Sequence, residues 1–141
     1  MNIYFACSIT GGRDFETVYQ AIVTALLADG HEVPTSHLAD PEVKELEKIV
    51  SPRDVYERDA AWIQGCDALV AEVSTPSHGV GYEVAYALSL GKPVLCLYQE
   101  KRAVSKMITG NTHPNIHVEA YRSVPEAVAS LRAFLKGAGR L

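Results

Sequence analysis

Apolar residues along this chain gather in short continuous runs that alternate with longer segments of mixed character. Runs of this kind, ended by glycine, proline or serine, are typical of strands buried on both faces. The pattern predicts strands at residues 3–7, 31–34, 67–73, 93–98 and 116–118. The run at 31–34 is the weakest of these, because it contains His31 and Glu32 and ends at Pro34.

The segments between these runs carry apolar residues at the spacing of one helix face. They predict helices over residues 15–27, 52–66, 84–90, 104–108 and 124–136. Ser51 before Pro52 and Ser123 before Val124 are typical helix starts. Asp40 followed by a proline is typical of an N-cap and the first position of a helix. Because residues 40–50 are charged, this segment is either a short helix or a mobile lid.

The alternation of strands and helices predicts the fold class. Strands too apolar to be half exposed favour a parallel sheet that is covered on both faces. We therefore expect a single α/β domain over residues 1–141, with a five-stranded parallel sheet in a flavodoxin-like or Rossmann-like three-layer arrangement. In such sheets ligands bind at the carboxyl ends of the strands, where the strand order reverses.

Composition limits the class of protein. Apolar residues make up 48% of the chain and charged residues 21%, and the net charge of −4 argues against a general nucleic-acid surface. The three cysteines lack paired spacing and read as buried, reduced thiols. The sequence shows neither a signal peptide nor a membrane span, so we expect a cytoplasmic protein. The histidines show no metal-ligand spacing, and we expect neither a metal nor a cofactor.

The most informative motif is the glycine-containing turn at residues 77–83, between the strand at 67–73 and a predicted helix. Glycines let the backbone approach a ligand, and the free N–H groups at a helix start bind anions. Ser77 adds a hydroxyl, while Glu83 lies in the first turn of the helix. A carboxylate beside an anion site suggests chemistry, although a glutamate here could simply support its helix.

Asp59 is the second candidate, because it falls on the apolar stripe of the helix at 52–66. Burial there tends to raise the pKa of a carboxyl unless a cation lies nearby, which suits a general acid. Alternatively, Asp59 caps a loop or accepts a bond from a backbone amide. Glu83 held ionised by amides and Asp59 held protonated by burial would together suit cleavage of an acetal-like bond to a sugar.

The first strand offers two further candidates. Tyr4 could orient a carboxylate with its hydroxyl, or it could be an ordinary core tyrosine. The turn after that strand holds Ser8 and the pair Gly11 and Gly12, which would leave backbone amides free. This turn is neither a dinucleotide fingerprint nor a P-loop, so dinucleotides and nucleoside triphosphates fit poorly.

Four segments in the same order bear a family resemblance, namely residues 4–13, 57–62, 71–83 and 105–108. The chain resembles the 2'-deoxynucleoside 5'-monophosphate N-glycosidases of the nucleoside 2-deoxyribosyltransferase superfamily over nearly its whole length. The resemblance implies that Glu83 is the nucleophile of a covalent deoxyribosyl intermediate, that Asp59 protonates or positions the departing base, and that Tyr4 holds the nucleophile. The residues implied to bind the 5'-phosphate are Ser8, Ile9, Thr10, Gly11, Gly12, Arg13, Ser77 and Gly79.

The same resemblance implies a homodimer. Ser105 would reach the phosphate in the neighbouring subunit's site, Met107 would help to wall that pocket, and His37 would lie near the base. The chain departs from the family pattern at Thr10, where relatives carry arginine, and Arg13 is the candidate to compensate.

Three other functions stay open on the sequence alone. One is transfer of deoxyribose between bases, and Ser77 argues against it because an acidic side chain there would suit a free 5'-hydroxyl. A second is hydrolysis of a ribonucleotide such as CMP. The third is a non-catalytic nucleotide-binding module, which would need no pair of carboxylates.

Overall fold

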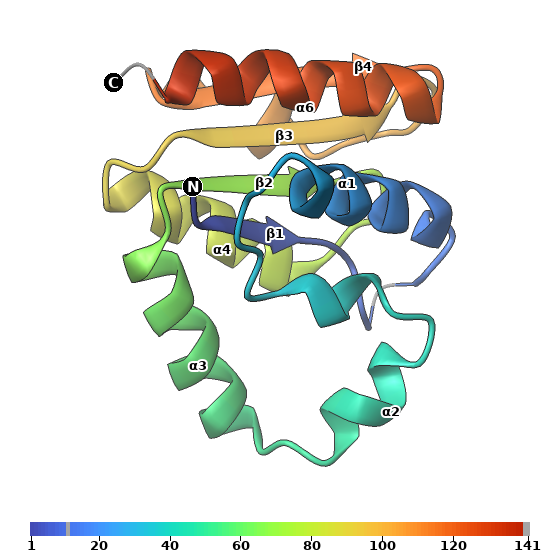
Figure 1. The fold of residues 1–141 in the computed structure, drawn as a ribbon, viewed down its shortest axis with the longest axis vertical. Coiled ribbons are helices and arrows are strands. Elements are labelled where there is room, and N and C mark those ends of the chain that lie inside the picture. Colours follow the sequence, from blue (N-terminus) through green and yellow to red (C-terminus); the bar gives the residue numbers. More distant parts are fainter. Residues whose placement is uncertain (11, 140–141) are drawn as a thin grey trace.

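The computed structural model describes residues 1–10 and 12–139. Its sheet has four parallel strands in the order β1-β2-β3-β4 (Figure 1). Their bounds are β1 Ile3–Ala6, β2 Ala68–Glu72, β3 Val94–Gln99 and β4 Ile116–Tyr121. In the register Ile3 pairs with Ala68 and Leu69 pairs with Val94. The strands at 3–7, 67–73, 93–98 and 116–118 are thus confirmed, with ends shifted by one to three residues.

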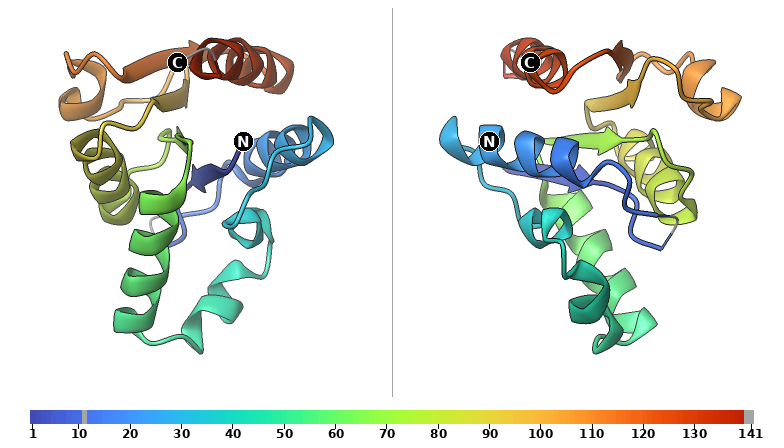
Figure 2. Two further views of the ribbon diagram at one scale, coloured as in Figure 1. Left: turned by 60° about the vertical axis from the view of Figure 1, so that its left-hand side comes forward. Right: turned by 90° about the vertical axis from the view of Figure 1, so that its right-hand side faces the viewer.

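Helices cover both faces of this sheet (Figure 2). α1 (Glu16–Ala28) and α6 (Val124–Ala138) pack on one face, while α4 (His78–Ser89), α5 (Lys106–Thr109) and the end of α3 (Pro52–Gly65) pack on the other. Alternate strand residues supply the two cores: Ile3 and Phe5 face α1, whereas Tyr4 and Ala6 face α4. The predicted three-layer arrangement is therefore confirmed.

The predicted fifth strand at 31–34 is wrong. Glu32 forms only an isolated parallel bridge with Asn2, at the β1 edge of the sheet. Beyond it Pro34 has no N–H to donate, and the backbone N–H of Phe5 donates instead to the Thr35 hydroxyl at 2.9 Å. A hydrogen bond to a side chain thus takes the place of the backbone hydrogen bonds that a longer strand would form with β1. The bridge still places the chain on the far side of β1 from β2, so the strand order reverses between β1 and β2.

The charged segment contains the short helix, one of the two alternatives that its sequence left open, and a role as a mobile lid stays a prediction. It folds into a short 3-10 helix, η1 (Ser36–Ala39), and a six-residue helix, α2 (Val43–Lys48). Asp40 does not cap α2 as predicted, because its carboxylate accepts a bond from the N–H of Glu42, before the helix begins. Figure 1 shows α2 and the start of α3 extending together away from the sheet.

The caps at Ser51 and Ser123 follow the sequence. The predicted turn at 77–83 is wrong: Ser77 caps α4, which begins at His78, so Glu83 lies in the second turn of the helix rather than in its first. The Ser51, Ser77, Ser105 and Ser123 hydroxyls each accept a backbone N–H in the first turn of the helix that follows. Among the described residues, every helix is too short or too polar to cross a lipid bilayer.

Candidate active site

The side chains of Tyr4 from β1 and Glu83 from α4 meet on the face of the sheet that α4 covers. Tyr4 is fully buried, and its hydroxyl donates to Oε1 of Glu83 at 3.0 Å. Burial raises the pKa of Tyr4, and the neighbouring charges of Glu83 and Asp59 raise it further. Tyr4 therefore stays protonated and acts as a fixed donor. The two expectations for Tyr4 are both met, since it is a core residue that also orients a carboxylate.

Asp59 and Glu83 line one small cavity between α3 and α4. Its volume is about 190 Å³, and Gly79, Tyr56 and Tyr82 also line it. Two carboxylates that lie far apart in the sequence are thus brought to a common space, as the pairing hypothesis requires. The helical spacing of α3 and the first turns of α4 together produce this convergence.

The protonation of Glu83 differs from the expectation. Burial raises the pKa of Glu83 to about 8, against the lowering effect of the Tyr4 bond, and the charge of Asp59 adds to the increase. Tyr4 supplies the hydrogen bond to this carboxylate, in place of the backbone amides that the sequence suggested. In the free protein Glu83 is therefore mostly neutral near pH 7, and the expectation that amides keep it ionised is wrong.

A cation, the Arg58 guanidinium, contacts Asp59. Nε of Arg58 donates to Oδ1 of Asp59 at 2.8 Å. Partial burial disfavours the charged form of Arg58, yet the bond to Asp59 and the charges of Asp59 and Glu47 raise the pKa of the guanidinium above its usual range. The proposed acid is therefore in direct contact with a permanent cation.

The candidates for phosphate binding lie at the carboxyl ends of β1 and β2. Ser8 is fully buried, and its hydroxyl has no hydrogen-bond partner within the part of the chain that the structure describes. Gly12 has a φ of 128°, a conformation that favours glycine. Ile9 and Thr10 precede it in the same turn, and Gly11 lies outside the described residues.

The residues expected around the phosphate divide between two cavities. Gly79 lines the cavity of the carboxylates, whereas Ser77, Ser105 and Met107 of the same chain line a larger apolar cavity of about 580 Å³. Met107 is largely exposed. The Ser77 hydroxyl also caps α4 by accepting the N–H of Val80 at 3.3 Å.

The Arg13 guanidinium forms hydrogen bonds with acceptors in its own chain. Its Nε donates to Glu16 at 2.8 Å, its Nη1 to the carbonyls of Ser8 and Leu38, and its Nη2 to the carbonyl of Asp40. The guanidinium is nearly buried and ties the turn after β1 to the segment around η1. Its role toward a phosphate stays a prediction, and a phosphate would have to compete with these acceptors.

The structure adds residues that sequence reasoning missed. Glu47 of α2 contacts His37 at 2.9 Å and Arg58 at 3.1 Å, and the Arg58 guanidinium lies over the Trp62 ring at 4.9 Å. His37 therefore lies on the Asp59 side of the site. Arg58 could have been found from the sequence, because it is the cationic residue next to the candidate acid Asp59. Glu47 could not, because it is one of several acidic residues in a charged segment.

The family model described as nucleoside 2-deoxyribosyltransferase matches residues 3–125. The chain belongs to this family.

Two relatives of this chain carry hydrolase names. A 2'-deoxynucleoside 5'-phosphate N-hydrolase from Methanococcoides burtonii is 41% identical over 121 residues, which cover 86% of this chain and 99% of the relative. A 5-hydroxymethyl-dUMP N-hydrolase from Mus musculus is 44% identical over 113 residues, which cover 77% of this chain and 65% of the relative.

Solved structures show the same fold. A CMP N-glycosidase from Clostridium botulinum superposes with a TM-score of 0.70 and 22% identity, covering 94% of this chain and 99% of that one. A 2-deoxyribosyltransferase from Bacillus psychrosaccharolyticus superposes with a TM-score of 0.63 and 21% identity, covering 91% and 90% of the two chains. At these identities the likeness concerns the fold alone.

Proposed function

We propose that this protein hydrolyses the N-glycosidic bond of 2'-deoxynucleoside 5'-monophosphates, releasing the free base and 2-deoxyribose 5-phosphate. The observation that carries the proposal is the cavity lined by both Asp59 and Glu83, with the Tyr4 hydroxyl bonded to Glu83. The family and the names of the hydrolase relatives support it.

The two carboxylates would act in two steps. An oxygen of ionised Glu83 attacks the anomeric carbon, and the electrons of the C–N bond leave with the base, which takes a proton from Asp59. Water then attacks the same carbon, gives a proton to Asp59 and frees Glu83. The productive form therefore has one proton on the pair, carried by Asp59. Burial raises the pKa of Glu83 to about 8, so near pH 7 only a minority of the molecules carry the ionised nucleophile.

The other end of the substrate would be held at the sheet edge. The 5'-phosphate would meet the Ser8 hydroxyl, the amides of the turn after β1 and the first N–H groups of α4 beside Ser77 and Gly79. We place the base toward His37. We also propose that a second copy of this domain supplies Ser105 and Met107 to complete the site in a homodimer.

A substrate panel tests the proposal. The purified protein is incubated with dGMP, deoxyguanosine and CMP, and free base is measured by chromatography. We expect base from dGMP at a rate far above that from deoxyguanosine. Base exchange between free nucleosides would instead indicate a transferase, and release from CMP would indicate a ribonucleotide hydrolase. An absence of turnover with every nucleotide, together with monophosphate binding, would indicate a binding module.

The Glu83→Ala variant supplies the matching control. It should lose turnover while it still binds monophosphates. Activity near that of the wild type would show that Glu83 is not the nucleophile.

A further inference from the structure

The proposed acid, Asp59, belongs to a group of four charged or titratable side chains. Arg58 is the centre of the group: its Nε donates to Asp59 at 2.8 Å, and its Nη2 donates to Glu47 at 3.1 Å. Nε2 of His37 contacts the same oxygen of Glu47, Oε1, at 2.9 Å. The group joins three elements, η1, α2 and α3, and we call these four residues the Arg58 cluster.

The Arg58 cluster differs from the other ion pairs of the same helices. The exposed fraction of the side chain is 15% for Glu47 and 16% for Asp59, whereas in the Arg53–Glu57 pair of α3 it is 83% and 56%. Exposed pairs contribute little because water and salt screen them, while partly buried pairs are screened much less. The guanidinium also lies over the Trp62 ring, with Cζ 4.9 Å from the ring centroid, so Arg58 is held by the ring as well as by its two carboxylates.

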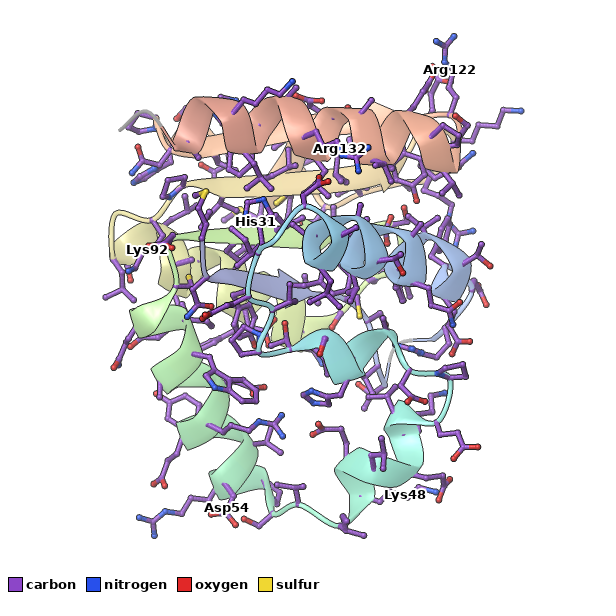
Figure 3. All side chains as sticks on the ribbon, viewed as in Figure 1. His31, Lys48, Asp54, Lys92, Arg122 and Arg132 are labelled. Atoms are coloured by element: carbon purple, nitrogen blue, oxygen red, sulfur yellow. The ribbon has the colours of Figure 1, made fainter. Side chains whose placement is uncertain are left out.

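Glu47 is also a main attachment of α2. This helix has six residues, and Val43 is its buried side chain. Lys48 and Glu45 of the same helix pair with each other on the surface, and Figure 3 shows Lys48 at the outer side of α2. The bonds of Glu47 to Arg58 therefore link residues 36–50 to α3 at the level of Asp59, rather than at the exposed tip where Figure 3 shows Asp54.

We propose that Arg58 is a positioning residue for Asp59 and that Glu47 couples the closure of residues 36–50 to that positioning. When residues 36–50 lie against α3, Glu47 holds one edge of the guanidinium, and the other edge holds Oδ1 of Asp59. The carboxyl group is then fixed in the cavity that it shares with Glu83. When residues 36–50 move away, Arg58 loses one of its two carboxylates and Asp59 loses a fixed orientation. The inference deepens the proposed function and rests on it for its kinetic part.

A double-mutant cycle tests the coupling. We expect Glu47→Gln and Arg58→Lys each to lower kcat for dGMP by about 10- to 100-fold, because small misplacements of catalytic groups have effects of this size. The change in KM should stay within about threefold, since neither residue is placed at the phosphate. The double variant should be no slower than the slower single variant, because both substitutions break the same unit.

Controls separate positioning from a general loss of structure. Glu57→Gln removes the exposed carboxylate of the Arg53–Glu57 pair on α3 and should leave kcat within about twofold, as surface substitutions usually do. Glu47→Asp keeps the charge and should recover part of the lost kcat. Additive effects of the two substitutions, or an unchanged kcat in Glu47→Gln, would overturn the proposal.

A second measurement does not depend on activity. Backbone hydrogen exchange over residues 41–50 should be faster in Glu47→Gln than in the wild type and unchanged in Glu57→Gln. Equal exchange in all three proteins would contradict the coupling, whether or not the protein hydrolyses nucleotides. If exchange is faster in Glu47→Gln alone, as predicted, but the wild type hydrolyses no nucleotide, the coupling stands and only the proposed function is rejected.

Discussion

Removal of the Tyr4 hydroxyl is the perturbation with the clearest consequence. In the Tyr4→Phe variant, Glu83 keeps its buried surroundings but loses the donor at 3.0 Å. A hydrogen bond to a charged group contributes about 1.5–3 kcal/mol, so the pKa of Glu83 should rise by about 1–2 units. Tyr4 stays protonated in the wild type, so the substitution removes a donor and leaves the charge of the site unchanged.

The magnitude of the effect follows from the protonation of Glu83. With a pKa of about 8, about one-tenth of Glu83 is ionised at pH 7. In Tyr4→Phe that fraction should fall by about another 10- to 100-fold, and kcat/KM for dGMP at pH 7 should fall with it. Because the nucleophile must be ionised, the difference between the two proteins should narrow as the pH rises toward 10.

The assay is the pH profile of kcat/KM from about pH 5 to pH 10 for both proteins. Tyr98→Phe is the matched control, since Tyr98 is a partly buried tyrosine on β3 that packs in the same core. Its profile should match that of the wild type. If the profile of Tyr4→Phe also matched the wild type in position and height, Tyr4 would not act through Glu83, and the reasoning would be refuted.

Three further predictions concern Glu83, Ser77 and Arg13. Because the pKa of Glu83 is raised, its contribution to stability is present below its ordinary pKa of 4.5 and is lost as the pH rises through about 8. In urea unfolding, Glu83→Gln should therefore be more stable than the wild type by about 2–4 kcal/mol at pH 9, and this gain should be absent near pH 4. Ser77→Asp should cost about 1–3 kcal/mol more in kcat/KM with dGMP than with deoxyguanosine, and equal losses would argue against a phosphate there. Arg13→Gln should lower the free energy of unfolding by about 1–3 kcal/mol because it removes a charged donor from the carbonyls of the buried residues Ser8 and Leu38, whereas exposed Arg122→Gln should change it by less than about 0.5 kcal/mol.

Much of the fold follows from local patterns. β1, β2 and β3 are largely apolar runs, whereas β4 mixes apolar and polar residues and is only partly buried. The helix starts at Ser51 and Ser123 are predictable from single residues, and the start of α4 at His78 was predicted six residues too late. The segment at 31–34 was misjudged because its pairing depends on a tertiary contact. Thr35 satisfies the N–H of Phe5, and no property of the segment itself indicates this bond.

The sequence identified which residues form the candidate site, but it did not predict their charge states. Helical spacing placed Asp59 on the inner stripe of α3, whereas Glu83 was predicted in the first turn of its helix and lies in the second turn of α4. Their charges depend on partners far apart in the sequence, with Tyr4 beside Glu83 and Glu47 beside Arg58. In the sequence the charged segment containing Glu47 reads as a solvated surface, and only the fold shows its carboxylate near Asp59.

The stereochemistry of transfer to methanol tests the central claim most directly. The reaction with dGMP is run in aqueous methanol, and the anomeric configuration of the methyl 2-deoxyriboside 5-phosphate is read by NMR. Attack by Glu83 followed by attack of the solvent inverts the anomeric carbon twice, so the β configuration of the nucleotide should be retained. A product with the α configuration would show a single displacement and would contradict the role of Glu83 as the nucleophile.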